Sequence, residues 1–252
     1  MSERQIRARG SEAGIWQRVE FGAYVADLPI WEEVAAETDP VLELGAGAGR
    51  VALHLARSGA EVVALDRDEG LISALRERAD AEDLAVTTVV GGVEDLRALW
   101  PLAAAPGSVL GPLHFVQELE PESRRGLLEA VADLCRPGAT VGLAVVDEQS
   151  LFEGGIEGGS VPDMIEIDGW VYSSEPLWVQ VSDETIEVRR LRQRVAPGGE
   201  IDRSVHDERL HRLDPDALEA EAAAAGLTPR ERHPVRSGPA EADSIAVIVE
   251  AG

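Results

Sequence analysis

VLELGAGAG, residues 41–49, is a short apolar run that passes into three glycines at alternate positions. The run from Pro40 to Leu44 predicts a buried strand, and the apolar spacing over 49–58 predicts a helix directly after the glycines. Glycines at such a turn allow positive φ angles and carry no Cβ, so the main chain can approach a ligand closely. The free amides of the helix start face the same turn. The stretch therefore predicts a ligand-binding turn between a strand and a helix.

The same alternation continues along the chain. Further strands are expected at 61–65, 85–90, 108–110 and 140–146, and helices at 69–79, 94–99 and 121–135. Strands that alternate with helices indicate an α/β fold with a Rossmann-like, mostly parallel sheet and helices on both faces. Ligands of such sheets lie at the carboxyl ends of the strands.

The pattern changes at both ends of this core. Two helices are expected within 11–37, separated by Asp27-Leu28-Pro29. Residues 169–213 are rich in β-forming residues, and the turn signals at 182–184 and 197–199 predict antiparallel hairpins. A helix at 215–225 and an antiparallel last strand at 244–250 follow. We expect an N-terminal helical cap at 1–39, a core at 40–150, an antiparallel insertion or lid at 151–213, and a C-terminal helix and strands at 214–252 that complete the core.

Composition limits the partners of the chain. The 252 residues carry a net charge of −24, which repels phosphate backbones and argues against a nucleic-acid partner. The dense basic run at 189–194 falls on an expected strand, where we expect its arginines to pair with nearby acids. No apolar run approaches the roughly 20 residues of a membrane helix, and the polar start resembles no secretory signal. A cytoplasmic protein without a membrane partner is expected.

Residue counts exclude several kinds of site. All 23 basic residues are Arg, which excludes a P-loop, a Schiff-base lysine and a Tyr-x-x-x-Lys pair. The single cysteine, Cys135, excludes an internal disulfide and a Cys-x-x-Cys site, and we expect it to be buried. His206 and His211 lie five residues apart, on opposite faces of a strand. No metal site is expected.

An acidic residue completes the glycine turn. Asp66 stands 17 residues after Gly49, at the end of the second expected strand, where a carboxylate can accept both ribose hydroxyls of an adenosine. A dinucleotide turn, Gly-x-Gly-x-x-Gly, would need a glycine where Arg50 stands. Glu43 adds a carboxylate that would repel a pyrophosphate and favour the cationic amino-acid end of S-adenosylmethionine. NAD(P) and a ligand-free structural turn remain as alternatives.

Residues 41–66 resemble the first motifs of the class I S-adenosylmethionine-dependent methyltransferases that act on small molecules. The resemblance continues more weakly through 93–96, 109–117, 134–146 and the terminal strand, and it lacks the acid that usually stands near the start of the fourth strand. It implies an enzyme that transfers the methyl group of S-adenosyl-L-methionine to an O, N or C nucleophile of a small-molecule acceptor. The product would be S-adenosyl-L-homocysteine.

The resemblance also implies a set of cofactor-binding residues. The methionine and ribose portions would lie against Glu43, Gly45, Ala46, Gly47 and Gly49. Asp66 would bind the ribose, Arg67 would flank the adenine, Val93 would pack nearby, and Glu94 or Asp95 would meet the adenine amino group. The sulfonium would be bordered by Leu110 and Gly111, and Tyr24 would close over the cofactor.

We expect the acceptor pocket to open beside residues 110–117. His114 is a candidate base or orienting group for a hydroxyl, with a structural role as the alternative. Gln117 is expected either to hydrogen-bond the acceptor or to cap the next helix. Methyl transfer needs mainly an in-line nucleophile and the exclusion of water, so a base is not obligatory.

Three aromatic residues of the hairpin layer, Trp170, Tyr172 and Trp178, are expected to form a lid over the substrate, or else a core or an interface. The edge of this layer could support a homodimer. Two further functions stay open at this point. One is an NAD(P)-binding oxidoreductase, and the other is a non-catalytic S-adenosylmethionine-binding or dimerisation protein of the same fold.

Overall fold

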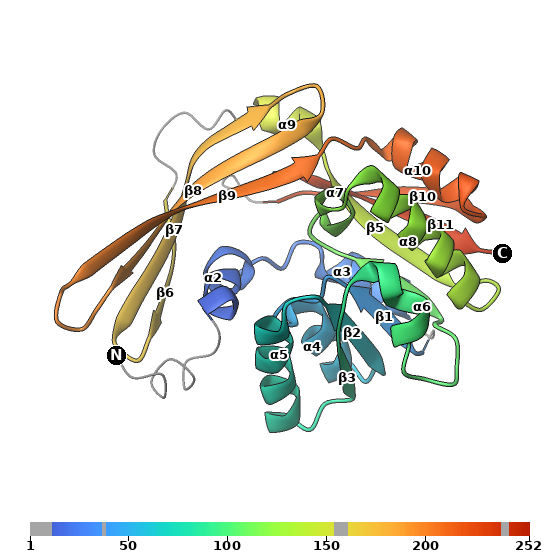
Figure 1. The fold of residues 1–252 in the computed structure, drawn as a ribbon, viewed down its shortest axis with the longest axis horizontal. Coiled ribbons are helices and arrows are strands. Elements are labelled where there is room, and N and C mark those ends of the chain that lie inside the picture. The colour runs from blue at the N-terminus through green and yellow to red at the C-terminus, as the bar shows by residue number, and fades with distance from the viewer. Residues whose placement is uncertain (1–11, 37–38, 154–160, 238–241) are drawn as a thin grey trace.

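A seven-stranded sheet forms the centre of the protein in the computed structural model, which describes residues 12–36, 39–153, 161–237 and 242–252 (Figure 1). The strand order is β10-β11-β5-β4-β1-β2-β3. The strands are β1 (Val41–Leu44), β2 (Val62–Asp66), β3 (Val86–Val90), β4 (Ser108–Gly111), β5 (Thr140–Val146), β10 (Leu227–Val235) and β11 (Ser244–Ala251). Strands β1 to β5 pair in parallel, and β11 runs antiparallel to β5 and to β10. The predicted Rossmann-like sheet with an antiparallel last strand is confirmed.

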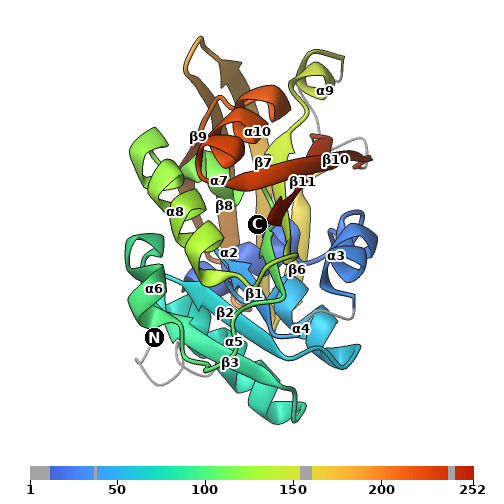
Figure 2. The same ribbon diagram turned by 90° about the vertical axis from the view of Figure 1, so that its right-hand side faces the viewer.

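Helices cover both faces of this sheet, as expected (Figure 2). One face carries α3 (Leu28–Ala35), α4 (Arg50–Arg57) and α5 (Glu69–Ala81), and the other carries η1 (Val93–Asp95), α6 (Leu96–Leu99), α8 (Pro121–Leu134) and α10 (Pro215–Ala224). Each face has its own apolar core, one around Trp31 and Leu53 and the other around Leu127 and Leu218. The break before α3 covers residues 22–27, and Leu28 and Pro29 of the expected break lie inside α3, because Pro29 fits the first turn of a helix and does not end it.

A second, four-stranded sheet lies beside the first. It consists of β6 (Asp163–Ile167), β7 (Trp170–Val181), β8 (Thr185–Val195) and β9 (Ile201–His211), all antiparallel and in chain order. The predicted antiparallel hairpin layer is confirmed, with β6 as an additional strand. Every arginine of the basic run pairs with an acid, as expected: Arg189 with Asp207, Arg190 with Asp163, Arg192 with Glu20, and Arg194 with Asp202.

Strand β10 and two short helices, α7 (Phe115–Glu118) and α9 (Glu148–Glu153), do not follow from the sequence pattern. Residues 227–235 contain Pro229 and Pro234, which argue against a strand in the middle of a sheet. Strand β10 is at the edge, where prolines are tolerated, and its pairing with β11 shifts register after Pro229.

Helix α2 (Glu12–Phe21) lies between the two sheets (Figure 1). Trp16 meets the ring of Tyr172 edge-on, with 5.8 Å between the centroids. Glu20 is buried and accepts two hydrogen bonds from Arg192 on β8. The hairpin aromatics therefore contact this helix or, in the case of Trp178, the guanidinium of Arg189 5.0 Å away. Trp170 and Tyr172 belong to a core around α2, which was one of the expected roles, whereas Trp178 lies outside this core.

Cys135, which follows α8, is buried, as expected. Burial raises the pKa of its thiol to about 12, so it stays protonated at neutral pH. None of the helices in the described part of the chain has the length and apolar character to cross a bilayer.

Candidate functional site

The glycine turn after β1 has the conformation that its sequence predicts. Gly45, Gly47 and Gly49 have φ angles of 64°, 54° and 83°. A Cβ on Gly45 would lie 2.3 Å from the ring of Phe115, so no larger residue fits there without displacing that ring. Helix α4 begins directly after Gly49 and directs its first amides toward the turn.

Asp66 holds this turn from the neighbouring strand. The backbone N–H of Gly47 donates to Asp66 Oδ2 over 2.8 Å, and the N–H of Asp68 donates to Oδ1 over the same distance. The carboxylate at the end of β2 is therefore fixed beside the end of β1. This is the carboxyl edge of the sheet, where the fold class predicts a ligand.

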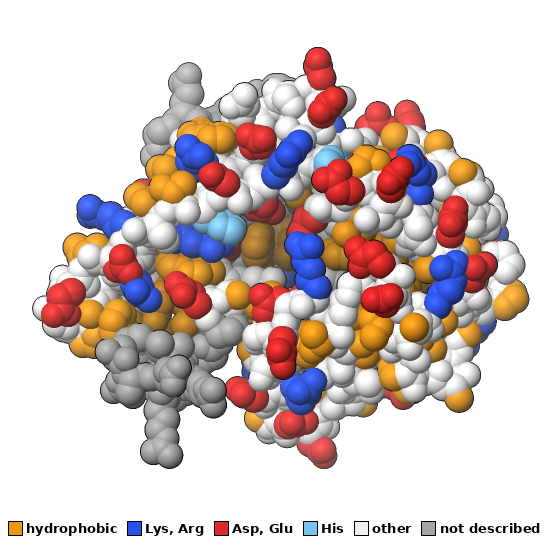
Figure 3. Space-filling view, in the orientation of Figure 1, with side chains coloured by type: hydrophobic (Ala, Val, Ile, Leu, Met, Phe, Trp, Pro, Cys, Tyr) orange, Lys and Arg blue, Asp and Glu red, His pale blue; other side chains and the backbone are white. Residues whose placement is uncertain are grey.

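Two adjoining cavities form a crevice along this edge, which we call the glycine-turn crevice. Their volumes are about 580 Å³ and 260 Å³. They share four lining residues, Gln17, Gly45, Phe115 and Glu118. The larger is also lined by Tyr24, Glu43 and Ala46, and the smaller by Asp66, Arg67, Val93 and Glu94. Figure 3 shows the surface hollowed between the seven-stranded core and the second sheet.

Five of the residues expected to bind the cofactor do not line these cavities: Gly47, Gly49, Asp95, Leu110 and Gly111. Gly47 contributes its amide to Asp66, and a Cβ on Gly49 would meet Leu75 at 2.1 Å. Leu110 is fully buried in the apolar core, and the next residues of the chain, Pro112 and Leu113, face the crevice instead. Of the two candidate acids of η1, the structure brings Glu94 to the smaller cavity.

Glu43 is a buried carboxyl group with one unpartnered oxygen. It is 3% exposed, and its Oε2 atom has no hydrogen bond in the structure. Burial raises its pKa to about 8, although Arg50 lowers it. Arg50 itself binds Asp27 through two hydrogen bonds of 2.6 Å. Glu43 is therefore mainly protonated near pH 7, which corrects the expectation of a standing negative charge at the turn. A ligand that brings a positive group to this oxygen fits the site.

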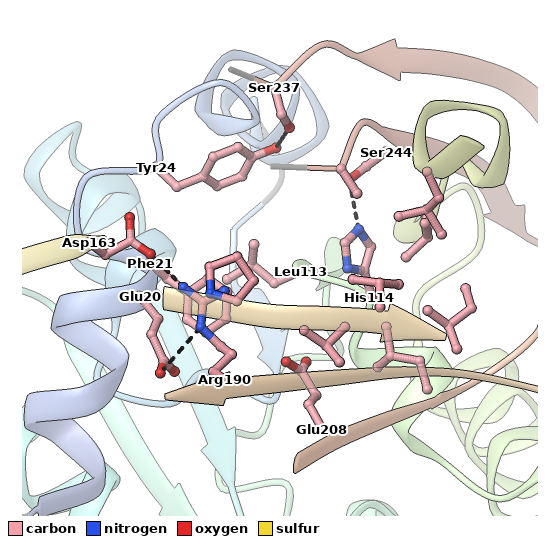
Figure 4. Close-up of a pocket in the computed structure, with 18 of the residues that line it drawn as sticks. Glu20, Phe21, Tyr24, Leu113, His114, Asp163, Arg190, Glu208, Ser237 and Ser244 are labelled. Atoms are coloured by element: carbon pink, nitrogen blue, oxygen red, sulfur yellow. Dashed lines mark hydrogen bonds and ion pairs between the residues drawn. The ribbon is translucent and has the colours of Figure 1, made fainter. Parts of the chain in front are cut away.

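A third cavity, of about 150 Å³, lies between the core and the second sheet (Figure 4). We call it the inter-sheet cavity. Its apolar wall comes mainly from Val146, Val179, Ile186, Val188 and Leu210. Its polar groups are Glu20, Tyr24, His114, Asp163, Arg190, Glu208, Ser237 and Ser244. Four residues, Phe21, Tyr24, Leu113 and Glu208, line both this cavity and the glycine-turn crevice, so the two spaces adjoin.

His114 lies in the wall of the inter-sheet cavity. Its backbone is left-handed, with φ of 64°, and its Nε2 is 2.7 Å from Ser244 Oγ. Burial lowers the pKa of His114 to about 4, so the ring is neutral at pH 7. A neutral ring can orient a polar group, but its low pKa makes it a poor general base.

Gln117 has neither of the two roles expected for it, which were to hydrogen-bond the acceptor or to cap the next helix. It is fully buried and lines none of the three cavities. Its Oε1 accepts from the N–H of Val146 at 2.8 Å, and its Nε2 donates to the carbonyl of His211 at 3.2 Å. The amide thus ties the end of β5 to the end of β9, and both of its ends are occupied.

Sequence reasoning missed Gln17, Phe115 and Glu118, although all three border both parts of the glycine-turn crevice. Gln17 Oε1 accepts from the N–H of Ala48 at 2.8 Å. No local pattern connects these two positions, which are 31 residues apart. Phe115 falls within the 110–117 stretch assigned to the acceptor pocket, so an aromatic residue there was a usable signal.

The residues that the structure describes contain no group of three or more His, Cys, Asp or Glu arranged to hold a metal ion.

Residues 41–138 match a family model described as "Methyltransferase domain". The protein-L-isoaspartate O-methyltransferase of Methylorubrum extorquens (strain PA1) is 39% identical over 87 residues, which are 34% of this chain and 37% of that protein. The chain thus spans well under half the length of that relative.

Two solved structures share the fold over most of the chain. The S-adenosylmethionine-bound amino pentose methyltransferase CalS10 from Micromonospora echinaspora is 18% identical, with a TM-score of 0.63 over 97% of this chain and 95% of that one. The glycopeptide N-methyltransferase MtfA, complexed with S-adenosyl-L-homocysteine, is 24% identical, with a TM-score of 0.61 over 89% and 87%.

Proposed function

We propose that this protein, whose residues 41–138 match a methyltransferase domain, transfers the methyl group of S-adenosylmethionine to a small-molecule acceptor. One observation carries the proposal. The glycine-turn crevice, which has the carboxylate and the bare backbone that an adenosine needs, adjoins a second cavity at Tyr24 and Leu113. Donor and acceptor would meet at this junction.

Within the crevice, each residue has a role that fits its position. Asp66 accepts hydrogen bonds from the ribose hydroxyls, and Glu94 accepts from the adenine amino group, with Arg67 and Val93 beside the ring. Glu43 takes the cationic amino group, which satisfies its unpartnered oxygen. When bound, S-adenosylmethionine supplies a methyl group made electrophilic by its sulfonium.

The inter-sheet cavity would hold the acceptor. In this proposal the core at 40–150 binds the donor, and the described parts of the cap at 1–39 and of the insertion at 151–213 enclose the acceptor, while 214–252 complete the core. The apolar wall excludes water, and His114 and Tyr24 orient polar groups of the acceptor. Carboxyl groups outnumber cations in the lining, three to one, which favours an amine over an anionic acceptor. CalS10 and MtfA are described as amino pentose and N-methyltransferases, in agreement with this preference.

Calorimetry and a transfer assay test the proposal together. We expect S-adenosyl-L-homocysteine to bind and NADH not to bind, and we expect radiolabelled methyl groups to pass from S-adenosylmethionine to members of a small-molecule library. Binding of NADH alone would contradict the proposal. Binding of S-adenosyl-L-homocysteine without any methyl transfer would favour a non-catalytic binding protein.

A further inference from the structure

Glu208 lies where the two spaces meet. It stands on β9, is half-buried, and lines both the inter-sheet cavity and the glycine-turn crevice. In Figure 4 its carboxyl group is directed from the strand toward the interior of the cavity. It is the acidic residue common to both linings within the described part of the chain.

The other two carboxylates of the inter-sheet cavity already have partners. Glu20 accepts from Arg192 and, at 2.7 Å, from Ser174 Oγ. Asp163 is paired with Arg190. Among the residues that the structure describes, none forms a hydrogen bond or an ion pair with the side chain of Glu208. A carboxyl group in this position is free to receive a ligand.

The surroundings of Glu208 favour its protonated form. Burial raises its pKa, and the negative charge of Glu20 raises it further, while Arg190 and Arg192 oppose the shift. Glu118 is a second like charge nearby, since Glu208 raises the pKa of that residue as well. A positive group at Glu208 would relieve this repulsion.

We propose that Glu208 selects an amine as the methyl acceptor and takes its proton before transfer. This inference rests on the proposed methyltransferase function. An ammonium group bound at Glu208 gives one proton to the carboxylate, which leaves a lone pair on nitrogen. The lone pair then forms the N–C bond to the methyl carbon while the C–S bond breaks and its electrons remain on sulfur. The product amine carries the positive charge, and the proton stays on Glu208 until solvent removes it.

Neither of the neighbouring acid–base groups fits this role as well. His114 is a weak base because burial lowers its pKa to about 4. Glu118 has a pKa raised to about 7, mainly by burial, but it lines the crevice and not the inter-sheet cavity. Only Glu208 combines an unpartnered carboxyl group with access to both spaces among these three.

The test compares the wild-type protein with Glu208→Gln and with Asp202→Asn. Asp202 is an exposed acid on the same strand, paired with Arg194 and outside all three cavities, so it matches the change in charge. Because no hydrogen bond of Glu208 is lost, we expect Glu208→Gln to melt at or above the wild-type temperature. We also expect its affinity for S-adenosyl-L-homocysteine to stay within about twofold of the wild type.

The acceptor arm uses a fixed library of primary and secondary amines, each matched with the alcohol of the same skeleton. We expect wild type and Asp202→Asn to methylate amines, and Glu208→Gln to do so about 100-fold more slowly. The acidic limb of the pH–rate profile should move to higher pH in Glu208→Gln alone, because the ammonium must then lose its proton to solvent before transfer. Preferred methylation of the alcohols, or equal rates in Glu208→Gln, would overturn the proposal.

A binding arm decides the case in which no library member is methylated. Protein saturated with S-adenosyl-L-homocysteine is titrated with the same amines and alcohols. Amines that bind the wild type at least tenfold more tightly than Glu208→Gln support the role in recognition. If no amine shows that preference, the role of Glu208 is refuted even though donor binding is intact. Failure of S-adenosyl-L-homocysteine to bind the wild type would instead refute the methyltransferase function itself.

Discussion

The amide of Gly47 and the carboxylate of Asp66 are joined by a hydrogen bond of 2.8 Å that crosses from the turn after β1 to the end of β2. One oxygen of Asp66 therefore stabilises the turn that the ligand would occupy, and the other accepts from Asp68. The residue both shapes the glycine turn and presents acceptor atoms at the carboxyl edge of the sheet.

Asp66→Ala should weaken the binding of S-adenosyl-L-homocysteine by about 1–3 kcal/mol, because charge-assisted hydrogen bonds to the ribose are lost. Calorimetry measures the change. Glu69→Gln is the control, since Glu69 is an exposed acid at the start of α5 and lines none of the cavities. Unchanged affinity in a folded Asp66→Ala protein would remove this residue from the site.

Binding at the glycine turn should release a proton from Glu43. The carboxyl group has a pKa of about 8 in the free protein and is mainly protonated at pH 7. A cationic amino group beside it lowers that pKa, so the carboxyl ionises on binding. Titration of S-adenosyl-L-homocysteine in buffers of different ionisation enthalpy should show a release that approaches one proton. Glu43→Gln should show none from this site, and an equal release in both proteins would contradict the assignment.

His114 should make the protein sensitive to acid. Its pKa is about 4 when folded and about 6.5 when unfolded, so between these values the unfolded state binds more protons. Stability is therefore lost as the pH falls from 6.5 to 4, by roughly 2–3 kcal/mol from this group. His114→Asn should reduce the loss, and Asn tolerates the left-handed backbone at this position. Urea unfolding at pH 7 and pH 4.5 gives the difference. Equal pH dependence in both proteins would refute it.

The ion pair between α8 and α10 should matter more for stability than those at the surface. Arg124 has a side chain that is 4% exposed and donates twice to Glu221, at 2.7 and 2.8 Å. Arg124→Ala should cost about 3–5 kcal/mol, because it leaves a partly buried acid unpaired. Arg97→Ala breaks the exposed pair with Asp133 and should cost about 1 kcal/mol or less. Chemical denaturation of the two variants measures both, and similar losses would contradict the expected difference.

The fold was largely predictable because its signals are local. Each of these signals depends on residues only a few positions apart in the sequence. They are the glycine turn, the periodicity of α5 and α8, and the hairpin breaks at 182–184 and 197–199. Strand β10 was missed because its prolines are allowed only by its place at the sheet edge, and a single sequence does not reveal that place.

The site was less predictable because tertiary contacts assemble it. Gln17 reaches Ala48 from a separate helix, and Glu208 enters the junction from a strand that lies far along the chain. The partners of Gln117 lie 29 and 94 residues away, which no helix-capping pattern indicates. Burial, and not sequence, sets the pKa values of Glu43 and His114. A homodimer through the second sheet stays a prediction.

Helix α2 carries Gln17 against the glycine turn and, one turn further on, Glu20 against Arg192 and Ser174 of the second sheet. Helix α2 is thus held by hydrogen bonds both at the glycine turn and at the second sheet. If either ligand moved this helix, it would alter the free energy of binding of the other. Linkage then requires the effect to be mutual, so each ligand changes the dissociation constant of its companion by the same factor.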